Sequence, residues 1–525
     1  MIRFAHLLDS LLLTPARNAK LRLMEEYFRT VPDPDRGWAL AALTGALSFP
    51  AVKPAQVRAL AESRVDAELF RWSYDFVGDL AETVALIWPT ADETATNHPP
   101  PPSLSEIVGE LQSATRAEAV EAVARWLDLL DATGRWALLK LVTGGMRVGV
   151  SARLAKTAVA SLRPVEPDAV EEIWHGLEPP YSELFRWLEG KSDRPHPGEK
   201  AVFVPLMLAN PIEPGEMEAL DPTKYLAEWK WDGIRVQLAA RGGQRRVFSR
   251  MGDDISGAFP EIAAALADGT VLDGELLVVR GGEVAPFNDL QQRLNRKTVT
   301  AKMLAQYPAF VRLYDALFLG GEDLRSLPLL ERRARLEAWY AGASHTLFDL
   351  SPLILFASWS ELEQLRADAR SKGIEGLMLK RRDAPYVSGR PKGPWFKWKR
   401  DALTFDAVLM YAQRGHGKRS SFYSDYTFGA WRGEELVPVG KAYSGFTDEE
   451  LVKLDRWVRN HTVERFGPVR SVEPGLVLEI AFDSVHESTR HKSGLAMRFP
   501  RVHRIRWDKP AKEADTVENL AKLKT

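Results

Sequence analysis

The chain has 525 residues, of which 45% are hydrophobic and 27% charged, and its net charge is −1. This length predicts about three domains. The near-zero net charge excludes a uniformly basic protein, although local basic clusters remain compatible with it. The absence of cysteine excludes disulfides and every zinc site built on thiolates, so any metal ion would need oxygen or imidazole ligands.

The first part of the chain, residues 1–205, carries apolar residues at intervals of three and four, which predicts a mostly helical domain. The proline-rich stretch TNHPPPPSLSE divides this region and is expected to be an extended connection. Asp9 interrupts the N-terminal apolar run, so we do not interpret that run as a signal peptide. No uninterrupted apolar run of about twenty residues occurs, and we expect no membrane span.

The sequence pattern changes after residue 205 from helical spacing to short β-rich runs. Residues 206–402 alternate short β-rich runs such as VLDGELLVV with helices such as PLLERRARLEAWY, which predicts an α+β domain built on a sheet. Residues 403–525 contain closely spaced strands with glycine and aromatic residues, which predicts a small β-barrel.

The stretch LAEWKWDGIRVQL, residues 226–238, places a lysine between two tryptophans and among acids. If the segment is a strand, alternation puts Glu228, Lys230 and Asp232 on one face. A lysine nucleophile must lose its proton, and neighbouring positive charge and desolvation are the known means of achieving this.

Two further runs place acids on strands. In TVLDGELLVV, alternation puts Asp273 and Glu275 on an otherwise apolar face, which is costly unless a cation meets them. The alternative is a strand end whose acids reach solvent or an arginine. In GIEGLMLK, alternation puts Glu375 on the face of Leu377 and Leu379.

The run GPWFKWKRD sets Lys397 and Lys399 on one strand face. Two lysines at this spacing can clamp a phosphate, although a solvated basic edge strand is the alternative. Together with the embedded acids, this pattern favours Mg²⁺ held by carboxylates beside substrate phosphates.

The hexapeptide KWDGIR (230–235) is the K-x-D-G-x-R signature of covalent nucleotidyltransferases. The order of the later motifs, ending in RFPRVHRIRWDKPAKEADT (498–516), resembles the ATP-dependent DNA ligases over nearly the whole chain. The resemblance implies an all-α DNA-binding domain (1–205), an α+β adenylation (nucleotidyltransferase) domain with ATP-grasp-like antiparallel sheets (206–402), and an OB-fold β-barrel (403–525). It also implies the sealing of 3′-hydroxyl/5′-phosphate nicks through a lysyl-AMP intermediate and a DNA-adenylate.

The resemblance implies catalytic roles for five basic residues. Lys230 is expected to attack the α-phosphate of ATP, Lys397 and Lys399 to contact that phosphate, and Arg506 and Lys509 of the RWDK motif to orient the leaving pyrophosphate. Asp508 matches the same motif. A hinge near 399–407 is expected, because the barrel must close over the nucleotide and later open.

The expected contacts to the nucleotide also follow from the resemblance. Glu228 is expected to read the adenine amino group and Tyr314 to stack on the ring, while Arg235 and Arg250 contact ribose and phosphate. An ordinary strand aromatic facing the core is the alternative for Tyr314.

For the metal ion, the resemblance implies that Glu275 contacts ribose and metal and that Glu375 holds the divalent ion, Mg²⁺ with Mn²⁺ as an alternative. The roles of Asp232 and Lys380 are left open.

Two segments resemble DNA-binding parts of the family. LLKLVTGGMRVGVSARLA (138–155) suggests contacts from Gly144, Gly145 and Arg147, and a tight helix-to-helix turn is the alternative for the glycines. The stretch QRGHGKRSSFYSDY suggests duplex contacts from Arg414, Lys418 and Arg419, with a solvated loop as the alternative.

The expected partner is nicked double-stranded DNA, bound by a monomer in repair, replication or recombination. The expected location is the cytoplasm, with nucleoid association if the source is prokaryotic. An RNA ligase or capping-type nucleotidyltransferase shares the K-x-D-G lysine, but a capping enzyme lacks the helical domain and the RWDK ending. An NAD-dependent ligase is disfavoured because that class uses a cysteine zinc module. An inactive DNA-binding scaffold is the alternative of a different class, and the presence of Lys230 argues against it.

Overall fold

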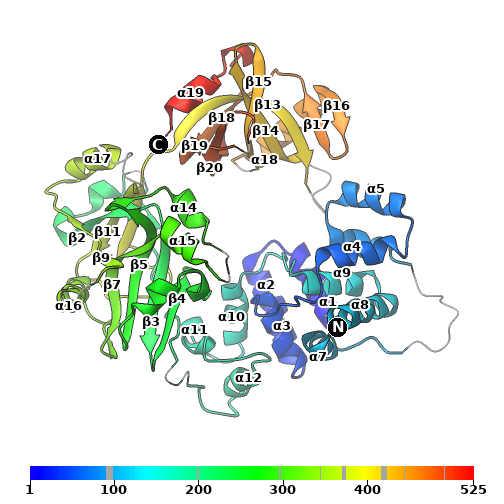
Figure 1. Cartoon of the computed structure of the whole chain (residues 1–525), viewed down its shortest axis with the longest axis horizontal. Helices are drawn as coiled ribbons and strands as arrows, with labels where there is room; N and C mark the ends of the chain where they lie inside the picture. Colours follow the sequence, from blue (N-terminus) through cyan, green and yellow to red (C-terminus); the bar gives the residue numbers. More distant parts are fainter. Residues whose placement is uncertain are drawn as a thin grey trace. The chain divides into compact units, whose positions relative to one another are not determined.

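The computed structural model describes residues 1–89, 99–196, 198, 200–213, 215–294, 296, 298–342, 345–368, 374–415, 423–443, 445–489 and 491–524. Its chain divides into two compact units, one made of 1–159 and 401–525 and one made of 160–400. Figure 1 shows the helices and strands of each part. No described helix is both long and apolar enough to cross a membrane.

The helical region, residues 1–159, has local signals at its helix starts. Ser103, Thr115 and Asp131 each accept a backbone hydrogen bond at the start of the helix that follows them. The helix after Asp131 is the one that packs against α1, α6 and α8. The helices of the region are α1 (Ile2–Leu13), α2 (Arg17–Thr30), α3 (Asp35–Leu43), α4 (Pro54–Glu62), α5 (Ala67–Val77), α6 (Leu80–Ile87), α7 (Leu104–Ser113), α8 (Arg116–Leu129), α9 (Ala132–Thr143) and α10 (Ala152–Ala160).

The central unit, residues 160–400, contains two sheets. The first has the strand order β4-β3-β5-β7-β8, with β6 beside β5 and β9 beside β7, and the second has the order β1-β12-β11-β2-β10. The strands of the first are β3 (Ile234–Arg241), β4 (Gln244–Ser249), β5 (Thr270–Arg280), β6 (Glu283–Val284), β7 (Ala309–Leu319), β8 (Glu322–Asp323) and β9 (Phe348–Leu350). Those of the second are β1 (Asn210–Pro211), β2 (Tyr225–Trp231), β10 (Leu353–Ile354), β11 (Ile374–Arg381) and β12 (Trp395–Lys399).

The central unit also contains helices, two of which come from the end of the predicted helical domain. Glu172 on α11 forms an ion pair of 2.9 Å with Arg325, which follows β8. The helices are α11 (Pro167–Trp174), α12 (Ser182–Leu188), α13 (Pro260–Ala264), α14 (Phe287–Gln291), α15 (Ala301–Gln306), α16 (Leu329–Ala341) and α17 (Trp359–Asp368). The predicted domain boundary at residue 205 stays a prediction.

Strand β5 shows how the first sheet separates its two faces. Leu272, Leu276 and Val278 belong to the hydrophobic core that α13 and α16 cover. Asp273 and Glu275 alternate with them and therefore point to the opposite face, as the sequence predicts. Strand periodicity thus keeps both acids out of this core, including Glu275, the candidate ribose and metal ligand.

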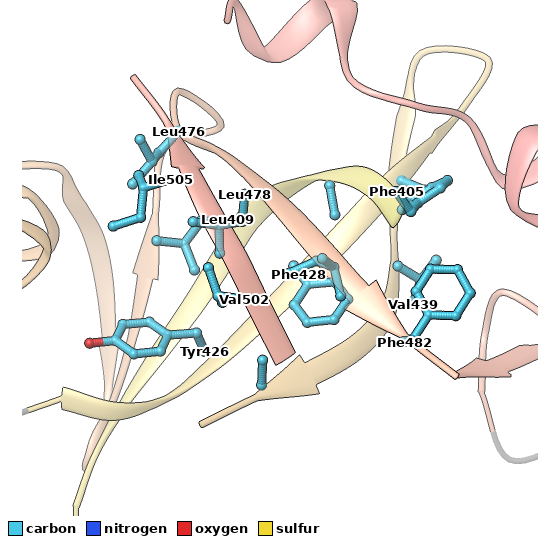
Figure 2. Packing of buried hydrophobic residues seen from close by; sticks show 14 of the residues in the cluster. Phe405, Leu409, Tyr426, Phe428, Val439, Leu476, Leu478, Phe482, Val502 and Ile505 are labelled. Carbon is cyan, nitrogen blue, oxygen red and sulfur yellow. The ribbon is translucent and has the colours of Figure 1, made fainter. Parts of the chain in front are cut away.

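The C-terminal sheet region, residues 401–525, packs strands around a large apolar core (Figure 2), and a smaller cluster of Val408, Val477 and Ala514 lies apart from it. Phe405, Tyr423, Tyr426, Phe428 and Phe482 contribute the buried aromatic part of this core. The elements are β13 (Leu403–Arg414), β14 (Tyr423–Arg432), β15 (Glu435–Ala442), α18 (Asp448–Asn460), β16 (Thr462–Phe466), β17 (Val469–Val472), β18 (Val477–Phe482), β19 (Ser484–Glu487), β20 (Leu495–Arg498), β21 (Arg501–Arg506) and α19 (Val517–Lys522). The prediction of a helical region followed by two sheet-based regions is confirmed.

Candidate active site

Lys230 lies in a row of residues that crosses the second sheet. On β11 its partner is Gly376, and the partner of Gly376 on β12 is Lys399. Because paired residues share a face, Lys230 and Lys399 project to the same side of the sheet. The neighbouring row brings Glu228 and Lys397 to that side through Met378. Strand register alone therefore gathers four of the predicted residues.

Glu375 forms an ion pair with Lys230, and its carboxylate lies 3.8 Å from the Lys399 ammonium group. Burial of Glu375 works against its ionisation, but the charges of Lys230 and Lys399 hold the pKa of its carboxyl below the usual range. The sequence prediction that Glu375 shares a face with Leu377 was wrong. The register shifts between Ile374 and Gly376, and this β-bulge turns Glu375 toward Lys230.

Gly376 makes this bulge sterically feasible. Its φ is 147°, a backbone conformation that residues with a side chain rarely adopt. A Cβ atom at this position would lie 2.2 Å from the carbonyl oxygen of Trp398 and 2.9 Å from Cα of Lys399. The absence of a side chain thus lets β11 and β12 approach closely beneath the candidate site.

The first sheet contributes Glu275, which is near enough to Lys230 and Glu375 for their charges to affect it. Burial, together with the negative charge of Glu375, raises the pKa of Glu275 to about 7, while Lys230 opposes the rise. Gly233 follows β2 and packs directly on β5, where an added Cβ atom would lie 2.5 Å from the carbonyl oxygen of Leu276. The glycine of the KWDGIR motif therefore allows the two sheets to approach one another.

Glu228 is buried, and both of its carboxylate oxygens lie 3.1 Å from the ammonium group of Lys380. That ammonium group also lies 4.2 Å from the ring centroid of Tyr314 and 4.9 Å from that of Trp395. Burial lowers the pKa of Lys380, and the charge of Glu228 opposes this effect. Charge and aromatic rings thus combine to fix the carboxylate of Glu228.

Arg235 is held by partners from three segments. Its guanidinium group donates to Asp273 at 2.7 Å, to the hydroxyl of Tyr386 at 3.0 Å and to the carbonyl oxygen of Met207 at 2.7 Å. Asp273 is fully buried and also accepts from Tyr386 at 2.6 Å. The buried acid on β5 is therefore met by a cation, which is the condition that makes its burial tolerable.

Lys397 lies in a cationic environment. Burial and the positive charges of Arg390, Lys399 and Arg250 lower the pKa of its ammonium group, with burial the larger effect. Arg250 is exposed in the turn after β4. The structure thus brings two predicted lysines and one predicted arginine into one positive region, which suits an anionic ligand such as a polyphosphate.

Glu275 and Glu375 are the candidate ligands for a divalent metal ion. No group of three or more His, Asp or Glu side chains arranged to hold a metal occurs within the described part of the chain. Glu275 and Glu375 nevertheless provide two neighbouring carboxylates from opposite sheets. Mg²⁺ commonly takes one or two protein carboxylates and completes its shell with water and phosphate oxygens, so this pair fits such an ion.

The predicted pyrophosphate residues lie in the C-terminal sheet region. Lys509 Nζ lies 2.8 Å and Arg506 Nη1 3.3 Å from the same oxygen, Oδ2 of Asp406. Arg506 also pairs with Asp508 at 2.9 Å, and this hydrogen bond lowers the pKa of the Asp508 carboxyl to about 2. The two cations of the RWDK motif are thus brought together by a residue that sequence reasoning did not single out.

The predicted DNA-binding loop begins where α9 ends. Gly144 caps the helix with φ 72°, its amide donates to Leu141 at 3.4 Å, and the amide of Gly145 donates to Lys140 at 2.9 Å. The helix end therefore uses both amides, as the helix-to-helix turn interpretation expects. Arg147 is exposed. The DNA contacts of these residues stay predictions.

Lys20 on α2 supports the second half of this loop. Its buried ammonium group donates to the carbonyl oxygens of Val148 and Gly149, both at 2.9 Å. Gly149 has φ 67°, and a Cβ atom there would lie 2.4 Å from the lysine nitrogen. A buried cation thus ties the loop to a distant helix.

Three basic residues of the C-terminal sheet region were predicted to contact the duplex. Arg414 lies at the end of β13, and its guanidinium group lies 5.9 Å from the ring centroid of Tyr423. Lys418 and Arg419 lie outside the described residues.

Sequence reasoning left Lys380 without a role and did not mention Tyr386. The pairing of β11 with β2 places Lys380 two residues along from Met378, the partner of Glu228, and so on the face of that acid. Alternation within GIEGLMLK already separated Lys380 from Leu377 and Leu379. Tyr386 lies between strands, where no periodic signal exists, and only the folded chain brings it to Arg235.

The sequence matches two family models. Residues 206–399 match the model described as ATP dependent DNA ligase domain, and residues 419–509 match the one described as ATP dependent DNA ligase C terminal region. The first match spans the two sheets of the candidate site from β1 to β12. The second ends at Lys509.

Two relatives agree with these matches, and one solved structure supports the fold. A probable DNA ligase of Koribacter versatilis is 36% identical, over 74% of this chain and 71% of that protein. A probable DNA ligase of Opitutus terrae is 31% identical, over 99% of this chain, which spans 62% of that longer protein. The solved structure named Pmar-Lig_PreS3 has a TM-score of 0.60 and 16% identity, covering 96% of this chain and 99% of that chain, which supports the fold.

Proposed function

This chain belongs to the ATP-dependent DNA ligase family, and from that premise we propose that it seals nicks with a 3′-hydroxyl and a 5′-phosphate in duplex DNA. The observation that carries the proposal is the row formed by Lys230, Gly376 and Lys399, with Glu375 turned into it by the bulge. It sets a candidate nucleophile beside a second cation that can hold a phosphate.

In the first step, Nζ of Lys230 attacks the α-phosphorus of ATP. An N–P bond forms, the P–O bond to pyrophosphate breaks, and the lysine loses its protons to give a lysyl-AMP. Lys397 and Lys399 bind the α-phosphate oxygens, and Arg506 and Lys509 stabilise the departing pyrophosphate. Glu375 pairs with the Lys230 ammonium group before ATP binds and keeps it directed into the site.

The nucleotide base and ribose are bound by residues of both sheets. Glu228, oriented by Lys380, accepts a hydrogen bond from the adenine amino group, and Tyr314 packs against the ring. Arg235 and Arg250 bind ribose and phosphate. Glu275 and Glu375 would hold Mg²⁺, or Mn²⁺, which when bound supplies positive charge at the phosphates.

In the second and third steps the chain acts on DNA. An oxygen of the 5′-phosphate attacks the phosphorus of lysyl-AMP, Lys230 leaves, and a DNA-adenylate forms. The 3′-hydroxyl then attacks the 5′-phosphorus and AMP leaves. The helical region (1–205) and an OB-type barrel (403–525) bind the duplex as a monomer, with Gly144, Gly145, Arg147, Arg414, Lys418 and Arg419 near its backbone. The adenylation domain (206–402) contains the ATP-grasp-like sheets.

Labelling with nucleotide tests the proposal. Purified protein, freed of bound AMP by treatment with pyrophosphate, is incubated with α-labelled ATP or GTP and Mg²⁺ and resolved on a denaturing gel. Acid-labile label from ATP that leaves when nicked DNA is added supports the proposal. Label from GTP alone would indicate a capping-type enzyme, and discharge onto nicked RNA but not DNA would indicate an RNA ligase. No label from either nucleotide would indicate an inactive scaffold.

A further inference from the structure

Asp406 is a buried carboxylate outside the core of the C-terminal sheet region. It lies on β13 between Phe405 and Ala407, which both belong to the apolar core, and Figure 2 shows Phe405 within that core. Strand alternation therefore directs Asp406 to the other face. Asp406 is only 9% exposed, so its negative charge needs cations or hydrogen-bond donors of the protein as partners.

The partners of Asp406 come from two directions. Glu479 on β18 is its cross-strand neighbour, and two acids placed opposite one another repel. Arg506 relieves this repulsion because its Nη1 lies 3.3 Å from Asp406 Oδ2 and 3.7 Å from Glu479 Oε2. Lys509 completes the cluster at 2.8 Å from the same oxygen of Asp406.

The backbone of Asp406 is also anchored. Its N–H donates to Asp515 Oδ2 at 2.8 Å, and its carbonyl oxygen accepts from the N–H of Asp515 at 2.9 Å. The carboxylate is therefore held on a rigid strand, whereas Arg506 and Lys509 are long side chains with many rotamers. Without an anion between them, these two cations would repel and separate.

We propose that Asp406 is a positioning residue for the adenylylation step, which holds Arg506 and Lys509 together on one oxygen atom as an oxygen of the departing pyrophosphate would. The inference rests on the proposed function, because it requires these two cations to act on pyrophosphate. In the transition state the P–O bond to pyrophosphate breaks and its oxygens gain negative charge. Cations that are already gathered need no reorganisation to stabilise that charge. In this role Asp406 acts through the two cations and not by its own contact with ATP or DNA.

The test separates three reactions of the full chain. We expect Asp406→Asn to slow lysyl-AMP formation at saturating ATP by about ten- to a hundredfold, the range for a misplaced catalytic group. Release of ATP from lysyl-AMP by added pyrophosphate passes through the same transition state and should slow by the same factor. Sealing of a chemically pre-adenylated nick involves no pyrophosphate and should keep the wild-type rate.

Asp455→Asn is the matched control. Asp455 lies on α18 of the same region, is 17% exposed and pairs with Arg459 at 2.6 Å, so its loss also removes a partly buried ion pair. It should leave all three rates unchanged. Asp406→Glu keeps the negative charge and should recover part of the lost rate of lysyl-AMP formation. If the asparagine variant does not fold, the three reactions are measured on the glutamate variant instead.

Several outcomes would overturn the inference. Equal loss in all three reactions would mean that Asp406 only supports the fold, and unchanged rates would mean that Arg506 and Lys509 need no positioning. A faster forward reaction would mean that the carboxylate competes with pyrophosphate for the cations. The proposed function fails in a different way, because the wild-type protein itself would then form no lysyl-AMP from ATP or would not transfer its AMP to nicked DNA.

Discussion

The central sheets and the loop after α9 hold their candidate residues in contrasting ways. In the sheets, Lys230, Glu228, Lys397 and Lys399 project from paired strands, where register sets their spacing. In the loop, Arg147 is exposed and its surroundings are tied to the helices by Lys20. Chemistry on one phosphorus atom needs positions fixed to fractions of an ångström, whereas contacts to a DNA backbone mainly require positive charge and a fitting shape.

We expect the largest loss of activity from a substitution of Lys230 on β2. Lys230→Ala removes the proposed nucleophile, so label transfer from α-labelled ATP should fall to background while binding to nicked DNA is retained. A gel assay for lysyl-AMP and a binding assay on the same DNA check both parts. Lys224→Ala, an exposed lysine just before β2, should label normally. Labelling of the Lys230→Ala protein would refute the nucleophile assignment.

Gly376→Ala tests whether the geometry of the bulge matters. The added methyl group would meet Trp398 at 2.2 Å, so β12 must move or the bulge must be lost. We expect adenylylation to slow by more than about tenfold and stability to fall by about 1–3 kcal/mol. Rates of lysyl-AMP formation and thermal unfolding measure the two effects.

Gly342→Ala is the control for this change, because a methyl group there makes only ordinary contacts with the end of α16. It should alter neither rate nor stability. If Gly376→Ala behaves like this control, the close approach of β11 and β12 is not needed for the site.

Lys20→Met should weaken binding to nicked DNA without changing lysyl-AMP formation. The variant leaves the carbonyl groups of Val148 and Gly149 without their cation, and we expect the helical region to lose about 1–3 kcal/mol of stability. Arg29→Met removes a cation from the same helix without touching the loop. Equal weakening by both variants would show that charge alone, and not the position of the loop, determines binding.

The smallest expected effect is on the pH dependence of the free energy of unfolding. The folded protein raises the pKa of Glu275 to about 7, above its ordinary value near 4.5, so the folded state prefers the protonated carboxyl. Stability from this group is therefore fully present below pH 4.5 and is lost as the pH rises through about 7. Glu275→Gln should remove this loss. Without divalent ions, the free energy of unfolding of the variant relative to wild type should therefore increase by on the order of 1–2 kcal/mol when the pH is raised from 5 to 8.

Denaturant unfolding of both proteins at these two pH values, in the presence of a chelator, measures this difference. A constant difference across the range would mean that Glu275 is already ionised at pH 5, and the burial of its carboxyl would then have no electrostatic cost.

The sequence was most informative where chemistry and periodicity coincide. Glu228 and Lys230 of β2, the acids of β5 and the lysine pair of β12 were placed on their strand faces by alternation, and the resemblance of KWDGIR added their expected roles. Asp232, which was predicted to share the face of Lys230, lies instead in the bend after β2. The three-part order of helices and sheets also followed from local patterns. These features depend on neighbours within one strand or helix, and a sequence displays such neighbours directly.

Alternation failed at Glu375, because a bulge needs a partner strand and no single strand reveals it. It also left Tyr386, Lys20 and Asp406 without a role, since their partners lie between 100 and 151 residues away. Composition and periodicity thus determined the class of each region and the residue types available for catalysis. Only the tertiary structure decided which charges meet, because long-range pairing and burial set the strength of each electrostatic interaction.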